Sequence, residues 1–151
     1  MKKYFIVAGE PSGDLHGSKL IKAIKDLNPN SSFMGHGGDN MRNEGMHIIE
    51  HVDSLAIMGF AEVLRHLPRM NKIMKNTVGA IERSKPDRVI LIDYPGFNLR
   101  LAKRLSPLRV PITYFILPQA WAWKQRRVEV LKKFIDQSIS IFPFENDWYK
   151  R

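Results

Sequence analysis

Short apolar runs alternate with amphipathic segments along the whole of this 151-residue chain. The first run, YFIVA at residues 4–8, precedes a glycine-containing turn and then residues 15–27, whose apolar positions recur at helical spacing. The runs predict strands and the amphipathic segments predict helices. Because strands that alternate with helices build parallel sheets, the sequence predicts an α/β domain.

The same periodicities predict the remaining elements. Residues 88–93, RVILID, are the strongest strand candidate, because a near-continuous apolar run is typical of a central parallel strand. Residues 61–84 carry an apolar stripe that predicts a long helix, which Pro68 either kinks or divides. Residues 54–60, SLAIMGF, are either a buried strand or an apolar lip for acyl chains. We expect further strands at 31–35, 47–52, 111–117 and 138–142, and further helices at 98–105, at 124–134 and beginning within 143–151.

Composition narrows the classes of function. The chain has no cysteine, which excludes disulfides and thiolate chemistry. No apolar run approaches about 18 residues, and the run near the N-terminus is too short for a signal peptide, so we expect a cytoplasmic protein. The formal net charge of +9 favours an anionic partner: nucleic acid, phospholipid headgroups or a phosphorylated substrate. No nucleic-acid-binding motif accompanies this charge. Among the five histidines only His47 and His51 show metal-ligand spacing, and we expect no metal site.

The turn after the first run, GEPSGDLHGSK at residues 9–19, matches neither a Walker loop nor a dinucleotide fingerprint, because its glycines recur at every fourth position. Glu10 and Asp14 would compete with a phosphate for the backbone N–H donors. Together with Ser12 they suit a hydroxyl-rich ligand such as a sugar. The alternative is an ordinary turn in which Ser12 or Asp14 caps the helix and Gly17 allows close helix packing.

Asp93 follows the strongest strand, and ligands of open parallel sheets gather outside the carboxyl ends of strands. The residue is therefore a candidate general base. The alternative is a capping aspartate ahead of Pro95. Residues 118–127, PQAWAWKQRR, either bind an anionic amphiphile or place one tryptophan in the core beside a solvated basic helix face.

Six ordered motifs make the chain resemble the N-terminal half of the lipid-A-disaccharide synthase family, bacterial glycosyltransferases of the GT-B fold. The motifs are AGEPSGD (8–14), GHGGDNMRNEG (35–45), AIMGFAEVL (56–64), KPDRVILIDYPGFN (85–98), LPQAWAWKQRR (117–127) and FPFE (142–145). The resemblance implies a three-layer, Rossmann-like domain with a mostly parallel sheet over residues 1–151. It also implies that the C-terminal nucleotide-binding domain is absent from this chain.

The resemblance implies an inverting transferase. It would join UDP-2,3-diacylglucosamine to 2,3-diacylglucosamine 1-phosphate, giving a β-1,6 disaccharide and UDP, without a metal or other cofactor. Asp93 falls on the family's proposed base. The candidate substrate-binding residues are Glu10, Ser12, Asp14, Met58, Phe60, Asn98, Gln119 and Trp121, with Met58 and Phe60 assigned to acyl contact. Many family members carry a second acid where this chain has Gly96, so a role for that acid cannot apply here.

The family resemblance also bears on partners. It implies peripheral association with the anionic inner membrane and no nucleic-acid partner, and we expect the chain alone to lack transferase activity. Two alternatives stay open at this point: a GT-B-like UDP-sugar epimerase domain, and a non-catalytic module that binds anionic lipid or nucleic acid.

Overall fold

A computed structural model describes residues 1–55, 63–116 and 125–139 of the chain. Its strands form one sheet in the order β3-β2-β1-β4-β5-β6, and every neighbouring pair is parallel. The strands are β1 (Lys3–Ala8), β2 (Ser32–Gly37), β3 (His47–His51), β4 (Arg88–Ile92), β5 (Ile112–Phe115) and β6 (Gln137–Ile139). The helices are α1 (Pro11–Leu27), α2 (Asp39–Asn43), α4 (Val63–Ser84), α5 (Pro95–Leu105) and α6 (Gln125–Phe134), with a short 3-10 turn, η1 (Ser106–Leu108).

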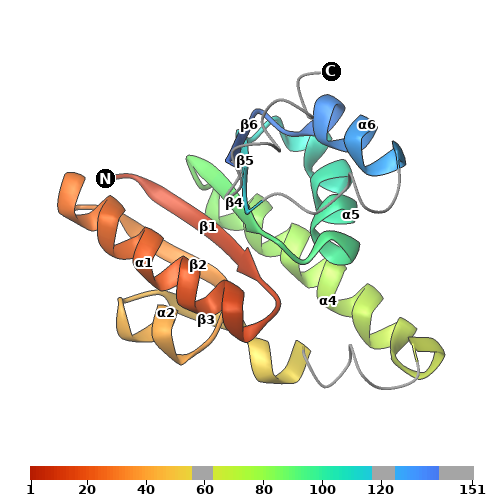
Figure 1. Cartoon of the computed structure of the whole chain (residues 1–151), viewed down its shortest axis with the longest axis horizontal. Coiled ribbons are helices and arrows are strands. Elements are labelled where there is room, and N and C mark those ends of the chain that lie inside the picture. The colour runs from red at the N-terminus through yellow and green to blue at the C-terminus, as the bar shows by residue number, and fades with distance from the viewer. Residues whose placement is uncertain (56–62, 117–124, 140–151) are drawn as a thin grey trace.

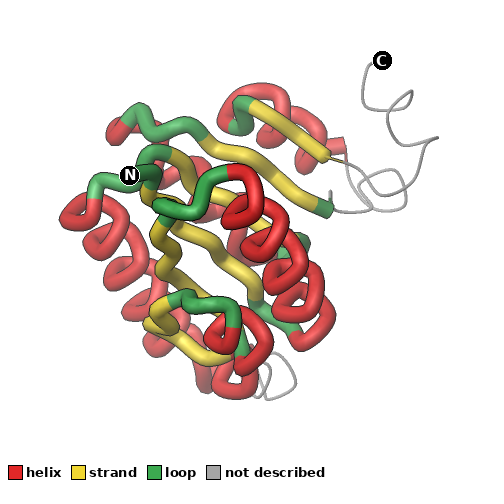
Figure 2. Tube along the Cα trace, turned by 90° about the vertical axis from the view of Figure 1, so that its left-hand side faces the viewer, coloured by secondary structure: helices red, strands yellow, loops and turns green. Residues whose placement is uncertain are grey.

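The sheet lies between two layers of helices (Figures 1 and 2). Successive side chains of a strand point to opposite faces, so β1 supplies Ile6 to one core and Val7 to the other. The core that contains Ile6 is closed by α1 and α2, and the core that contains Val7 is closed by α4, α5 and α6. The predicted three-layer α/β architecture with a parallel sheet is confirmed.

Two helices begin earlier than their apolar periodicity predicts. Helix α1 starts at Pro11 instead of residue 15, and α5 starts at Pro95 instead of residue 98. In each case proline lies in the first turn, where its missing N–H leaves no hydrogen bond unmade. The long helix is confirmed over 63–84 and continues through Pro68, so its division into two helices is wrong.

Residue 52 was expected to close a strand, but residues 52–55 are helical and β3 ends at His51. Within the 54–60 segment, residues 54 and 55 are helical, so a strand there is wrong, and residues 56–60 lie outside the described residues. Also outside them lie residues 61–62, 117 and 124 at the ends of expected elements, residues 140–142 of the last expected strand, and the helix expected within 143–151.

Candidate active site

The strand order places a topological switch point between β1 and β4. From β1 the chain adds β2 and β3 on one side, and it then returns to add β4, β5 and β6 on the other. In open α/β sheets ligands bind outside the carboxyl ends of the strands at such a point. Ala8 and Ile92 are register partners at these ends. The turn that carries Glu10 and the turn that carries Asp93 therefore lie next to each other, as the two sequence motifs require if they form one site.

The turn after β4 is strained. Asp93 and Tyr94 have φ angles of 45° and 48°, a left-handed conformation that side chains other than glycine rarely adopt. Ile116, at the end of the neighbouring β5, has a φ of 60°. Conformations of this kind cost about 1–3 kcal/mol each and cluster at functional sites. The side chain of Asp93 is half-buried at this edge of the sheet.

Tyr94 joins the two turns. A Cβ atom at Gly9 would lie 2.3 Å from Cδ1 of the Tyr94 ring, so only glycine leaves room for the ring over the first turn. The ring also stacks on Phe97, with 5.9 Å between ring centroids. Burial, and next the negative charge of Glu10, raise the pKa of Tyr94 above its ordinary value. Its hydroxyl is therefore a hydrogen-bond donor at neutral pH.

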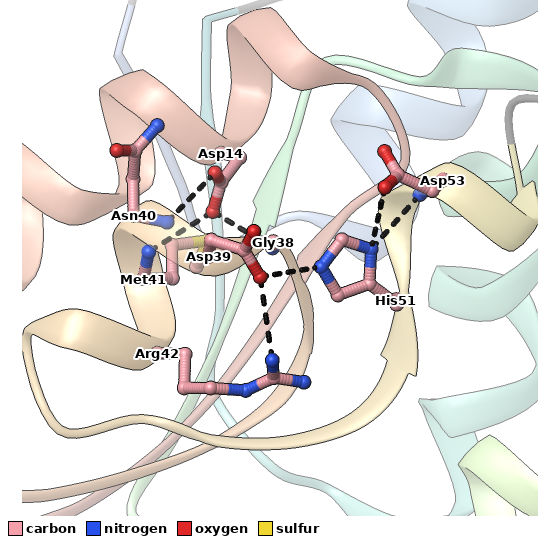
Figure 3. A network of polar contacts seen from close by, with 8 residues as sticks. All are labelled: Asp14, Gly38, Asp39, Asn40, Met41, Arg42, His51 and Asp53. Atoms are coloured by element: carbon pink, nitrogen blue, oxygen red, sulfur yellow. Dashed lines mark hydrogen bonds and ion pairs between the residues drawn. The ribbon is translucent and has the colours of Figure 1, made fainter.

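Glu10 and Ser12 are exposed at the start of α1, and neither Ser12 nor Asp14 caps this helix. The prediction that one of them does so is wrong. Asp14 is only 4% exposed and instead accepts hydrogen bonds from the first turn of α2 (Figure 3). Its Oδ1 accepts from the N–H groups of Gly38 (2.7 Å) and Met41 (3.0 Å), and its Oδ2 accepts from that of Asn40 (3.1 Å).

Gly17 is a packing position, as one interpretation of the sequence held. A Cβ atom there would lie 2.7 Å from Sδ of Met41 on α2. The glycine therefore lets α1 and α2 approach closely, and the expectation of close packing is confirmed.

Asn98 lies on α5 and is completely buried. Its Nδ2 donates to the backbone oxygens of Asp93 (2.8 Å), Ile92 (3.3 Å) and Val7 (3.4 Å). Its Oδ1 has no hydrogen-bond partner among the described residues. The contacts that the structure gives this side-chain amide thus run to the ends of β1 and β4.

A second polar network lies at the same edge of the sheet, after β2 and β3 (Figure 3). His51 Nε2 is 3.0 Å from Oδ1 of Asp39, and its Nδ1 accepts from the N–H of Asp53 at 3.1 Å. The hydrogen bond with His51 first, and then the positive charge of Arg42, hold the pKa of Asp39 below its ordinary value. Both ring nitrogens of His51 are therefore engaged, and the ring links the α2 end of the edge to the helical residues 52–55.

The candidate site residues named from the sequence did not include Tyr94, Asp39, His51 or Tyr114, whose hydroxyl donates to the backbone oxygen of Asp93. Tyr94 stands directly before a proline, and a residue in that position is ordinarily extended, so the sequence carried no signal for its left-handed conformation. Tyr114 lies within an apolar strand run, which carried no signal for a polar role either. Of the predicted site residues, Met58, Phe60, Gln119 and Trp121 lie outside the described residues.

The described residues contain neither a cluster of metal ligands nor a membrane-spanning helix. Within 1–55, 63–116 and 125–139, no group of three or more His, Asp or Glu side chains is arranged to hold a metal ion. None of the helices that the structure describes is long and apolar enough to cross a bilayer.

Comparison with known proteins identifies relatives along almost the whole chain. The family model described as lipid-A-disaccharide synthetase matches residues 4–151. The lipid-A-disaccharide synthase of Myxococcus xanthus is 40% identical over 148 residues, which are 98% of this chain and 39% of that protein. The enzyme of Coxiella burnetii is 37% identical over 150 residues, 99% of this chain and 40% of that protein. The chain thus spans about two fifths of the length of these relatives.

Two solved structures share the fold. A putative UDP-N-acetylglucosamine 2-epimerase from Listeria monocytogenes superposes with a TM-score of 0.67 at 9% identity, covering 99% of this chain and 41% of that one. The UDP-GlcNAc 2-epimerase of Neisseria meningitidis, bound to UDP-GlcNAc, gives a TM-score of 0.61 at 11% identity, covering 93% and 40%. At such low identities the likeness concerns the fold alone. The family match over residues 4–151 is specific, and by it the chain belongs to the lipid-A-disaccharide synthetase family.

Proposed function

We propose that this chain is the acceptor-side domain, residues 1–151, of an inverting glycosyltransferase that makes the lipid A disaccharide precursor. The donor is UDP-2,3-diacylglucosamine and the acceptor is 2,3-diacylglucosamine 1-phosphate. The observation that carries the proposal is the position of Asp93: the family match extends over it, and it stands at the switch point on a strained turn.

Asp93 acts as the general base in this proposal. Its carboxylate takes the proton from the 6-hydroxyl of the acceptor, the hydroxyl oxygen attacks C1 of the donor sugar, and the bond from C1 to the diphosphate breaks. UDP leaves with the bonding electron pair. A positioned base of this kind contributes about 10²- to 10⁴-fold to a rate. Because the attack is a single displacement, the sugar inverts and the new linkage is β-1,6.

Some of the polar side chains around Asp93 are exposed and others are buried, and we assign their roles accordingly. Glu10 and Ser12 are exposed on the neighbouring turn, which suits hydrogen bonding to sugar hydroxyls. Asp14 and Asn98 are buried, so they act through the backbone they hold. We assign Met58 and Phe60 to the acyl chains, and Gln119 and Trp121 to the cleft.

The nucleotide is held mainly by a second domain, which corresponds to the remaining three fifths of the relatives. The chain by itself is then inactive as a transferase. The coverage of the relatives, of which the chain spans about two fifths, supports this division.

Because the proposed substrates are lipids, the protein must meet them at a membrane surface. The charge distribution supports binding to an anionic membrane. The exposed cations of α4, α5 and α6 are Arg69, Lys72, Lys75, Arg83, Arg100, Lys103, Arg104, Lys132 and Lys133. The exposed carboxylates of the same helices, over their described side chains, are Glu82 and Glu129. We propose that the protein is cytoplasmic and that this basic helix layer holds it at the inner membrane.

A two-substrate assay separates this function from that of an epimerase, whose fold is shared. The test protein is a hybrid in which this chain replaces the matching part of the Myxococcus xanthus relative. We expect UDP release and disaccharide only when donor and acceptor are both supplied. Conversion of a soluble UDP-sugar without acceptor would favour an epimerase. A folded hybrid that makes no disaccharide from both substrates would contradict the proposed function.

A further inference from the structure

We infer that Asn98 and Tyr114 are positioning residues, which hold the carboxylate of Asp93 at the sheet edge by fixing the carbonyl of the same residue. The inference rests on the proposed role of Asp93 as the base. Neither residue need touch a substrate, and Asn98 thereby changes from a candidate substrate contact to a support of the base.

The backbone at Asp93 needs such support. Two consecutive residues other than glycine, Asp93 and Tyr94, have left-handed φ angles of 45° and 48°. For such residues this conformation costs about 1–2 kcal/mol each relative to the right-handed one. Without further constraints the turn would relax, and the direction of the Cα–Cβ bond of Asp93 would change with it.

Asn98 supplies one constraint from the helix that follows. Its backbone N–H donates to the Tyr94 oxygen at 3.0 Å, as expected in the first turn of α5. Its side chain then reaches back to the strand ends, where the shortest of its three contacts, 2.8 Å, is to the Asp93 oxygen. The residue is completely buried, so water does not compete for these donors.

Tyr114 supplies the second constraint from the neighbouring strand. It is completely buried on β5, and its hydroxyl donates to the same Asp93 oxygen. A carbonyl oxygen has two lone pairs, and the two donors use both. Donors from α5 and β5 together fix the plane of the peptide between Asp93 and Tyr94, and with it the ψ angle of Asp93.

The backbone N–H of Asp93 is also hydrogen-bonded. The N–H of Asp93 donates to the Phe115 oxygen at 3.2 Å, which continues the pairing of β4 with β5 beyond the last strand residue. Asp93 is therefore held at both of its peptide groups, by α5 and by β5. This arrangement sets the direction of the carboxylate before any ligand arrives.

The first test is made on the chain itself by NMR. The ¹³Cα and ¹³Cβ shifts and the HN–Hα couplings of Asp93 and Tyr94 report whether both residues are left-handed. We expect Tyr114→Phe, which removes one oxygen, and Asn98→Leu, which removes the amide, to move these values towards an averaged turn. The matched control is Tyr4→Phe, because the half-buried Tyr4 stacks on Phe33 near the opposite end of β1. Wild-type values in folded Tyr114→Phe would overturn the inference, even if Asn98→Leu failed to fold.

The second test is kinetic and uses the full-length hybrid. A displaced base lowers the rate of the chemical step and leaves substrate binding alone. We expect kcat to fall about 10-fold in Tyr114→Phe and further in Asn98→Leu, with KM for donor and acceptor within twofold, and no change in Tyr4→Phe. Unchanged kcat in Tyr114→Phe, in a hybrid that Asp93→Asn inactivates, would overturn the positioning role. Full activity of Asp93→Asn would instead remove the proposed function and leave the NMR result standing.

Discussion

Gly35 and Gly96 differ in the room that they leave for a side chain. Gly35 on β2 has a φ of +143°, and a Cβ atom there would lie 1.9 Å from the Ile6 oxygen on β1. Gly96 in the first turn of α5 has nothing within 4 Å of the corresponding position. We predict that Gly35→Ala destabilises the chain by more than about 3 kcal/mol, because both strand backbones would have to move.

Gly96→Ala is the matched control. In an open helical position alanine should stabilise by about 0.5–1 kcal/mol relative to glycine. Urea unfolding at neutral pH measures both free energies of unfolding. A Gly35→Ala variant as stable as the wild-type chain would show that β1 and β2 are not paired as described.

The sequence indicated where the candidate site residues lie along the chain better than it indicated which contacts they make. Asp93, Glu10 and Ser12 were expected at a strand end or on a turn, and they lie there. Asp14 and Asn98 carry the same kinds of polar groups, yet they are buried against backbone N–H and carbonyl groups. Gly38, a partner of Asp14, is 24 residues away from it in the sequence, and Val7, a partner of Asn98, is 91 residues away. No local sequence pattern encodes contacts between residues so far apart.

Asp14 links α1 to α2. Its carboxylate accepts three backbone N–H groups at the start of α2, so its removal leaves buried donors without an acceptor. We predict that Asp14→Ala lowers the free energy of unfolding by about 3 kcal/mol, and Asp14→Asn by less because the amide oxygen still accepts. Thermal and urea unfolding check this.

Asp26 offers a control on the same helix, because it is exposed. Asp26→Ala should change stability by less than about 0.5 kcal/mol. Equal stabilities of Asp14→Ala and Asp26→Ala would mean that the carboxylate of Asp14 does not hold α2.

His36 links β2 to α4. The Thr77 hydroxyl has one hydrogen, which it donates to the Ile73 oxygen at 2.6 Å. Its oxygen therefore accepts from His36 Nε2–H at 3.0 Å, and Nδ1 is left as an unprotonated nitrogen with no partner among the described residues. Protonation would place a charge and an unpaired donor in the core, and burial accordingly lowers the pKa of His36 from 6.5 to about 4.

The lowered pKa makes stability depend on pH. Between pH 6.5 and about 4, the His36 side chain is protonated in the unfolded chain and neutral in the folded chain. The contribution of neutral His36 to stability is therefore complete above pH 6.5 and is lost as the pH falls through this window. The difference between the two pKa values of His36 corresponds to about 3 kcal/mol in the free energy of unfolding. We predict that His36→Gln, whose amide can still donate to Thr77, loses this part of the pH dependence in urea unfolding from pH 7.5 to 4.5.

The exposed His47 on the edge strand β3 provides the comparison. His47→Gln should keep the wild-type pH dependence. A slope that survives in His36→Gln and disappears in His47→Gln would refute the assignment.

At the level of helices and strands, the sequence predicted the order and type of most elements because apolar spacing decides both. It missed boundaries where proline starts a helix, as at Pro11 and Pro95, since the first turn of a helix need not carry the apolar stripe. It also extended a strand to residue 52, because an apolar residue after a strand fits a buried helical turn equally well. Val52 is indeed buried there, at 3% exposure.

In the whole molecule, the basic helix layer is separate from the candidate active site. The cations of α4, α5 and α6 cover one layer, whereas Asp93 and Glu10 lie at the carboxyl edge of the sheet. Each well-placed cation contributes about 1 kcal/mol to binding at an anionic membrane. We predict that changing Lys103 and Arg104 together to Gln weakens binding to phosphatidylglycerol-containing vesicles about 30-fold at low salt, measured by co-sedimentation.

Two cations of the opposite layer serve as the control. Lys19 and Lys22 are exposed on α1, and changing both to Gln removes the same charge. This pair should weaken binding much less, and salt should release the wild-type chain by screening. Absence of binding at low salt, or equal losses in the two double variants, would exclude the basic helix layer as the membrane-facing surface.

The proposed chemistry depends most on Asp93, and the two ends of β4 allow a matched measurement. Asp87 precedes β4 and accepts from the Lys3 N–H at 2.7 Å, at the edge of the sheet opposite to Asp93. In the full-length hybrid, the rate of disaccharide formation from both lipid substrates should fall about 10²- to 10⁴-fold in Asp93→Asn and stay near the wild-type rate in Asp87→Asn. A folded Asp93→Asn variant that turns over within threefold of the wild-type rate would contradict the assignment of Asp93 as the base.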